Sequence, residues 1–167
     1  MPIYFAYGSN MFTKRLNASD RSPEARFICS GHIHGHALKF HKRGADGSGK
    51  ANAIRTENQD DIVYGALFEI GGANKSQLAK AEGVGKGYQE CGVNVILPDK
   101  RITAISFIAD PDAIQDDLKP FDWYLDLVIA GAREHKLPAN YIEQLEKVES
   151  IKDMDEGRIK LALRYLY

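Results

Sequence analysis

The 167-residue sequence has little cysteine, almost no net charge and no long apolar run. Cys29 and Cys91 are too few for a disulfide framework or a four-cysteine zinc site, and we expect both to stay reduced. The 22 Lys and Arg residues nearly balance the 23 Asp and Glu residues, which argues against a nucleic-acid partner. The apolar stretches are shorter than the roughly 18 residues of a membrane-spanning helix, which argues against a membrane partner.

The N-terminal segment, MPIYFAYGSN, has neither a basic leader nor a cleavage pattern. The sequence therefore predicts no signal peptide and a cytoplasmic location. It contains no internal repeat, low-complexity tract or linker, and its length suits one domain that spans residues 1–167.

Hydrophobic periodicity and turn residues predict strands with interspersed helices that come mostly late in the chain. The expected strands are 3–7, 27–42, 51–56, 62–70, 88–97 and 101–109, and the expected helices are 11–16, 74–82, 121–135, one that begins at Pro138, and 159–167. We expect Ser9 or Asn10 to cap the first helix and Asn74 the second. Residues 88–109 form a hairpin pattern, so an α+β fold is favoured over a doubly wound α/β fold.

Residues 44–50, GADGSGK, nearly match a phosphate-binding loop. The next residue is Ala51, so the hydroxyl group that would hold magnesium is missing. The segment that follows is predicted to be a strand rather than a helix whose N-terminus faces a phosphate. We therefore expect a solvent-exposed loop here and no nucleotide cofactor.

Three of the five histidines, His32, His34 and His36, are spaced by two residues. On one strand they would share a face at intervals of about 7 Å, which is compatible with a metal site. Three ligands on one straight strand rarely converge on one ion, however, and no cysteine or carboxylate elsewhere completes the set. We expect an ordinary polar strand face and no metal.

The segment Tyr7-Gly8-Ser9-Asn10 joins a predicted strand to a predicted helix. One interpretation is a turn with a helix cap. The other is an anion or oxyanion site, because successive N–H groups at a helix start point towards a negative ligand. We expect the chain to turn sharply enough there to need the conformational freedom of glycine, which also lets the backbone approach a ligand closely.

Glu82 ends a predicted helix directly before Gly83. A carboxylate at this end faces the negative pole of the helix dipole, which disfavours its ionised form. Such a group is suited to general acid or base catalysis, whereas the alternative is a surface glutamate in a poor position.

Three segments of the sequence together resemble the γ-glutamylcyclotransferase family, which includes AIG2-like proteins. They are IYFAYGSNM, Glu82-Gly83-Val84 followed by Gly87-Tyr88, and GAREHKLPANYIEQL. The resemblance runs from about Ile3 to Val148 and leaves the C-terminal IKLALRYLY outside. It implies a small, mixed and mostly antiparallel β-barrel with peripheral helices. It also implies a cofactor-free enzyme of glutathione metabolism that converts γ-glutamyl amino acids or amines into 5-oxoproline and the free amine.

The resemblance also implies roles for individual residues. Glu82 would be the catalytic general acid/base. The substrate would be bound by Tyr7, Gly8, Ser9, Asn10, Tyr88 and Tyr124. At Phe107 the family often has a tyrosine, a departure that bears on the substrate more than on the reaction. The substrate's own α-amine attacks its γ-carbonyl, so the reaction requires neither a metal nor another cofactor.

Two alternatives to a cyclotransferase stay open. One is a non-catalytic module that binds a γ-glutamyl or other small anionic ligand in the same pocket. The other is a metal-binding protein that uses the three spaced histidines. The sequence does not distinguish among amino acids, polyamines, lysine side chains and glutathione as the source of the leaving group, and it leaves the oligomeric state open, with a homodimer as one alternative.

Overall fold

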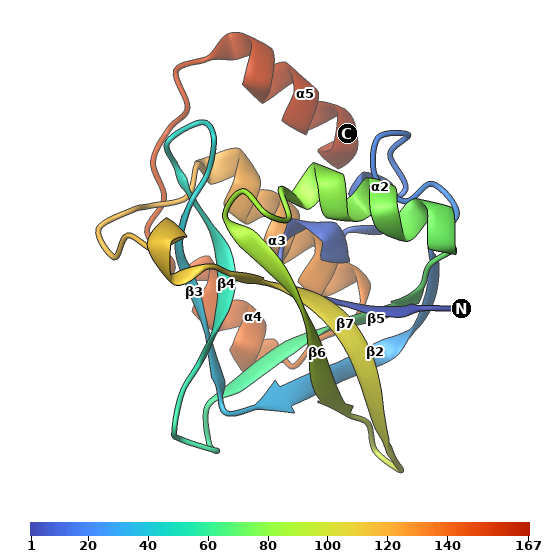
Figure 1. Cartoon of the computed structure of the whole chain (residues 1–167). Coiled ribbons are helices and arrows are strands. Elements are labelled where there is room, and N and C mark those ends of the chain that lie inside the picture. Colours follow the sequence, from blue (N-terminus) through green and yellow to red (C-terminus); the bar gives the residue numbers. More distant parts are fainter.

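A computed structural model describes all 167 residues and contains a closed five-stranded barrel (Figure 1). Its strands, in barrel order, are β1 (Ile3–Ala6), β5 (Ile62–Glu69), β2 (Arg26–His34), β6 (Tyr88–Ile96) and β7 (Arg101–Ala109). Every neighbouring pair is antiparallel except β1 and β7, whose parallel contact at Tyr4 and Ile105 closes the barrel. The predicted α+β fold with a mixed, mostly antiparallel barrel is confirmed, as is the hairpin of β6 and β7.

The single strand predicted over residues 27–42 is wrong. The chain turns at Gly35, whose φ of +70° lies in the left-handed region that favours glycine. The residues before it form β2 of the barrel, whereas β3 (His36–Arg43) pairs with β4 (Gly49–Arg55) in a separate two-stranded sheet. This hairpin stands beside the barrel in Figure 1.

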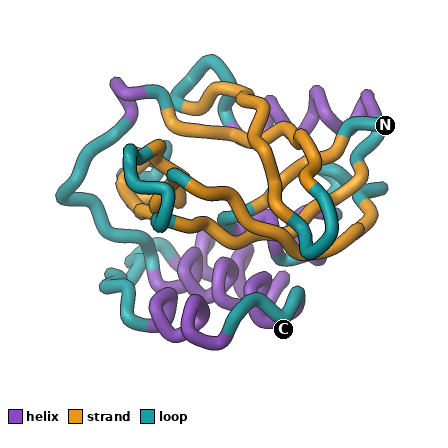
Figure 2. Tube along the Cα trace, turned by 90° about the horizontal axis from the view of Figure 1, so that it is seen from below, coloured by secondary structure: helices purple, strands orange, loops and turns teal.

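The helices lie outside the ring of strands (Figure 2). They are α1 (Thr13–Leu16), α2 (Gly72–Glu82), α3 (Asp122–Glu134), α4 (Ala139–Glu146) and α5 (Glu156–Leu166), with two short 3-10 turns, η1 (Ser9–Met11) and η2 (Pro111–Ala113). The four helices predicted after residue 70 are therefore present. No helix combines the length and the apolar character that crossing a membrane requires.

The predicted helix starts are less accurate than the helices themselves. Ser9 and Asn10 cap no helix, because they lie inside η1, and α1 begins only after Phe12. Asn74 is likewise inside α2, which begins two residues earlier, at Gly72. Pro138 is the residue before α4 rather than its first residue.

The helix α3 holds η1 in place against the barrel. Gly131 of α3 leaves room for this contact, because a Cβ atom there would lie 2.6 Å from both the Cβ of Met11 and the backbone nitrogen of Phe12. Met11 is itself fully buried. The turn that follows β1 is thus fixed between the barrel and α3, and Tyr124 reaches the same region from the first turn of α3.

The C-terminal helix α5 is anchored through the buried carboxylate of Asp153. Asp153 accepts hydrogen bonds from Arg158 at 2.7 and 2.8 Å and from the indole N–H of Trp123 at 2.9 Å. The Arg158 hydrogen bonds hold the pKa of Asp153 well below its ordinary value. The helix that lies outside the family resemblance is therefore tied to the start of α3.

Candidate active site

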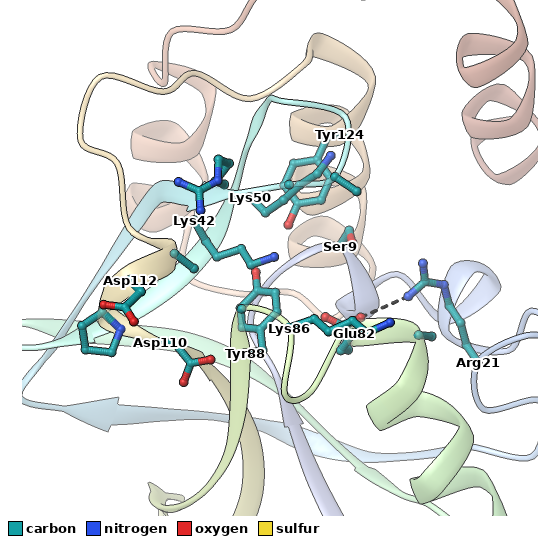
Figure 3. Close-up of a pocket in the computed structure, with 18 of the residues that line it drawn as sticks. Ser9, Arg21, Lys42, Lys50, Glu82, Lys86, Tyr88, Asp110, Asp112 and Tyr124 are labelled. Carbon is teal, nitrogen blue, oxygen red and sulfur yellow. Dashed lines mark hydrogen bonds and ion pairs between the residues drawn. The ribbon is translucent and has the colours of Figure 1, made fainter.

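A cavity of about 730 Å³ opens between the β3–β4 hairpin, the end of α2 and the segment after β7 (Figure 3). Its inner end leads to a narrow recess of about 20 Å³, which is room for one or two water molecules. The residues that line both spaces are Ser9, Glu82, Tyr88 and Tyr124. The recess is therefore too small for a whole substrate, and the outer cavity provides the larger space.

All seven site residues named from the sequence line the recess. They are Tyr7, Gly8, Ser9, Asn10, Glu82, Tyr88 and Tyr124. They come from five places in the chain: the turn after β1, η1, the end of α2, the start of β6 and α3. The recess also contains Tyr4, Ala51 and Phe107, of which sequence analysis singled out only Phe107.

Glu82 is the last residue of α2, as the sequence predicts. The helix ends there because Gly83 adopts the left-handed conformation, with a φ of +74°, and donates a hydrogen bond to the carbonyl of Lys80 at 3.1 Å. Two donors hold Oε1 of Glu82: Nδ2 of Asn10 at 2.6 Å and Nη1 of Arg21 at 3.0 Å. No protein group donates to Oε2, which leaves that oxygen free to exchange a proton with a ligand.

Arg21 is a site residue that sequence analysis missed. Its Nη1 contacts the carboxylate of Glu82 and the amide oxygen of Asn10, the second at 3.2 Å. The side chains of Arg21 and Glu82 are only 14% and 19% exposed, so solvent screens this ion pair weakly. The positive charge of Arg21 thus offsets the negative pole of the α2 dipole, which is the only influence on Glu82 that the sequence predicts. No local pattern marks Arg21, because it lies in an irregular loop after α1.

The tyrosine hydroxyl groups are mostly committed to the protein backbone. Tyr88 donates to the carbonyl of Ala51 at 2.7 Å, and the hydroxyl of Tyr124 accepts from the N–H of Ala51 at 3.0 Å. Tyr7 donates to the carbonyl of Phe107. Burial raises the pKa of all three tyrosines, so they remain protonated at neutral pH and shape the walls rather than act as bases.

Tyr4 and Phe107 face each other in the recess, with ring centroids 5.6 Å apart. Asn10 donates to the Tyr4 hydroxyl at 3.4 Å, and burial together with the charge of Glu82 raises the pKa of Tyr4. Phe107 is 3% exposed and offers no hydroxyl group to a ligand. The departure noted from the sequence therefore lies inside the recess, where it changes the polarity of the wall.

Gly8 does not adopt the left-handed conformation for which a turn most often needs glycine. Its φ of −107° lies outside the left-handed region. The space beside its Cα atom is limited instead, because an added Cβ atom would lie 3.2 Å from the Cβ of Ala51 and 3.5 Å from the Tyr124 hydroxyl. Glycine is thus suited to this position by close packing of the loop against β4 and α3.

The glycine-rich loop is not the plain solvent loop that the sequence predicts, because Gly44, Ala45 and Lys50 line the outer cavity. Lys50 pairs with Asp46 at 2.9 Å and lies 4.5 Å from the ring centroid of Tyr124. Its buried position lowers the pKa of Lys50. Sequence analysis treated this lysine only as part of a phosphate-loop pattern.

The three spaced histidines do not share one strand face. The rings of His32 and His34 are 5.1 Å apart, but His36 lies beyond the turn at Gly35, where its Nδ1 is 2.9 Å from the carbonyl of His34. No three His, Cys, Asp or Glu side chains are grouped as ligands of one metal ion. These histidines lie outside the recess and the outer cavity.

Residues 62–145 match the family model described as the AIG2-like family. The chain is 30% identical over 152 residues to human γ-glutamylcyclotransferase, which covers 88% of this chain and 78% of that protein, and 31% identical to the bovine enzyme with the same coverage. A solved γ-glutamyl cyclotransferase structure superimposes with a TM-score of 0.84 at 26% identity and covers 97% of this chain and 98% of its own.

Proposed function

This chain belongs to the AIG2-like γ-glutamylcyclotransferase family and is an enzyme of that type, and we propose that Glu82 is the general acid/base of its reaction. The proposed reaction converts a γ-glutamyl amino acid or amine into 5-oxoproline and the free amine. One observation carries the assignment: the Glu82 carboxylate lies where the recess meets the outer cavity, with Oε1 held and Oε2 free.

The substrate supplies its own nucleophile. Its α-nitrogen forms a bond to the γ-carbon, which closes a five-membered ring, and the bond from the γ-carbon to the leaving nitrogen breaks. Because both reacting groups belong to one molecule, the site contributes orientation rather than capture of a second reactant. At neutral pH two protons move from the α-ammonium group to the leaving nitrogen, which departs as an ammonium group.

Glu82 is the proton carrier in this scheme. Its Oε2 takes the two protons from the α-nitrogen one after the other and delivers each to the leaving nitrogen, and the same oxygen serves every transfer because it has no competing donor. Asn10 and Arg21 hold Oε1 and so fix the direction in which Oε2 points. They are positioning residues, since they act through the carboxylate.

The η1 turn supplies the donors for the negative charge on the carbonyl oxygen. The N–H groups of Met11 and Phe12 are bonded to the carbonyls of Gly8 and Ser9. The first N–H groups of a helical turn have no partner inside it, which leaves those of Ser9 and Asn10 for the oxyanion. The tyrosines are less suited to this role because their hydroxyl groups bind the backbone.

We further propose that the reaction uses no metal or other cofactor, since internal attack, one carboxylate and backbone donors account for every step. The two free cysteines support a cytoplasmic location for this single domain. The rival function, a non-catalytic module that binds an anion in the same pocket, is disfavoured because a carboxylate with a free oxygen, as in Glu82, serves proton transfer and adds nothing to the binding of an anion beside it.

The proposed function is tested by incubating the protein with γ-glutamyl dipeptides, glutathione and ε-(γ-glutamyl)lysine and measuring 5-oxoproline by mass spectrometry. We expect 5-oxoproline and the free amine in equal amounts from at least one substrate, and about a hundredfold less or lower with Glu82→Gln over the same time. Tight binding of a γ-glutamyl compound without any turnover would establish the binding module instead.

A further inference from the structure

The outer cavity carries an excess of positive charge. Its lining includes six cationic side chains, Arg15, Arg21, Lys42, Arg43, Lys50 and Lys86, and three carboxylates, Glu82, Asp110 and Asp112. Asp46, outside the lining, neutralises one of the lysines, Lys50. Two positive charges therefore remain in excess after every nearby carboxylate has been counted. Figure 3 shows Lys42 above the Tyr88 ring and Lys86 beside Glu82, with Asp110 and Asp112 on the other side of Tyr88.

Arg15 is the first cation without a partner. Its guanidinium group has no carboxylate within 4.0 Å and makes no side-chain hydrogen bond, and its Nε is shielded from solvent without an acceptor. Its guanidinium carbon lies 5.6 Å from the centroid of the Tyr165 ring, a cation–π distance. Burial lowers the pKa of Arg15, which agrees with a cation that lacks a counter-charge. Shielded donors of this kind are unfavourable unless a ligand satisfies them.

Lys42 is the second cation of the cavity without a carboxylate partner. The residue is 8% exposed, and its Nζ lies 4.5 Å from the centroid of the Tyr88 ring. No carboxylate lies within 4.0 Å of it, although Asp110 and Asp112 line the same cavity. Lys39 on the same strand shows the contrast, because it is exposed to solvent and lies outside the cavity. A buried lysine that points at the site wall without a partner is placed to meet a negative group of a ligand.

The net charge of the substrate determines whether it balances the excess positive charge of the cavity. A γ-glutamyl group carries one ammonium and one carboxylate group, so it adds no net charge to the site. The excess of two positive charges is balanced only when the leaving group brings two negative ones. A neutral amino acid brings one carboxylate, whereas a polyamine or a lysine side chain adds positive charge and is repelled.

We propose that the preferred substrates are γ-glutamyl compounds whose leaving amine carries two anionic groups, as an acidic amino acid does, and that Arg15 and Lys42 determine this specificity. The inference rests on the proposed function, since it names the substrate class of that reaction. Each extra carboxylate gains a charge-assisted hydrogen bond inside a partly buried cavity, which is worth about tenfold or more in affinity.

The test compares two substrates of nearly identical shape, γ-glutamyl-aspartate and γ-glutamyl-asparagine, which differ by one negative charge. With the wild-type protein at low salt, we expect kcat/KM for the aspartate compound to exceed that for the asparagine compound by about tenfold or more. The ratio should shrink as the salt concentration rises. The same ratio is then measured for Lys42→Met, Arg15→Met and the control Lys39→Met.

Substitution of Lys42 or Arg15 should lower the ratio severalfold, whereas Lys39→Met should leave it at the wild-type value. Equal kcat/KM for the two compounds, or a preference for asparagine, would overturn the proposal and leave the cyclotransferase reaction standing. Absence of 5-oxoproline from every γ-glutamyl compound would overturn the proposed function itself. The wild-type comparison decides the question even where a variant fails to fold.

Discussion

The amide of Asn10 donates a hydrogen bond of 2.6 Å to Oε1 of Glu82, a residue 72 positions away along the chain. This bond joins the turn after β1 to the end of α2, two elements that share no sheet. It makes the direction of the carboxylate depend on the position of the turn, so that the proposed base and the proposed oxyanion donors move as one unit. Arg21 bonds to both residues and closes the network.

Replacing Glu82 by Gln should reduce kcat by about 10²–10⁴-fold, because the amide keeps the shape of the side chain and cannot carry a proton. Substrate binding, measured by calorimetry, should persist. The matched control is Glu90→Gln, since Glu90 is an exposed residue that pairs with Lys75 at 3.2 Å outside the cavity. A Glu82→Gln variant that keeps more than about a tenth of wild-type turnover would remove Glu82 from the mechanism.

Asn10→Ala removes a positioning contact without touching the carboxylate. We expect kcat to fall by up to about 10²-fold, with a smaller change in KM, because Oε1 of Glu82 keeps only Arg21 as a donor and Oε2 loses its fixed direction. Asn10→Gln, which keeps an amide donor, should recover part of the loss. If KM rises while kcat stays constant, Asn10 binds substrate and does not position the base.

Gly8→Ala separates packing in the site from folding. The backbone of Gly8 lies outside the left-handed region, so we expect the melting temperature to change less than the activity. The added methyl group would lie 3.2 Å from the Cβ of Ala51 and 3.5 Å from the Tyr124 hydroxyl, and it should displace the wall of the recess and abolish most activity. A fully active Gly8→Ala protein would show that close approach at this loop is unimportant.

Lys42→Met should alter how stability depends on pH. Burial lowers the pKa of Lys42 in the folded protein below its ordinary value of 10.5. Between these two pKa values the unfolded chain binds more protons, so this lysine makes wild-type stability rise with pH in that alkaline window. The stability of wild type relative to Lys42→Met, from urea unfolding at pH 7 and pH 10, should therefore increase with pH. A constant difference would contradict the burial argument, and Lys39→Met serves as the control.

The parts of the site that the sequence predicts are those with local signals. Gly83 follows the last helical residue and needs a left-handed conformation, so it marks Glu82 as a helix end. The strand Ile3–Ala6 followed by Gly8 marks the turn in the same way. The family resemblance then connects the two segments, which no local pattern does.

The parts that the sequence does not predict depend on long-range placement. Arg21 reaches Glu82 across 61 positions from an irregular loop, where periodicity carries no information. Lys42 looks like an outward residue of a strand, and only the departure of β3 from the barrel at Gly35 directs it into a cavity. The turn at Gly35 was visible only as a glycine inside an alternating run, a feature that also fits a bulge.

Activity should not depend on a metal or on the three spaced histidines. The proposed reaction obtains its nucleophile from the substrate, its proton transfers from Glu82 and its oxyanion donors from the backbone, so a chelator should leave kcat/KM unchanged. Joint replacement of His32, His34 and His36 by Gln should lower stability and leave the activity unchanged. It removes contacts such as the His32–Tyr64 ring pair, whose centroids are 5.3 Å apart, whereas none of the three histidines lines the cavity. The measurements are 5-oxoproline formation with and without chelator and the melting temperature of the triple variant. If a chelator abolished activity, zinc restored it and the triple variant were inactive, the chemistry would belong to the histidines rather than to Glu82.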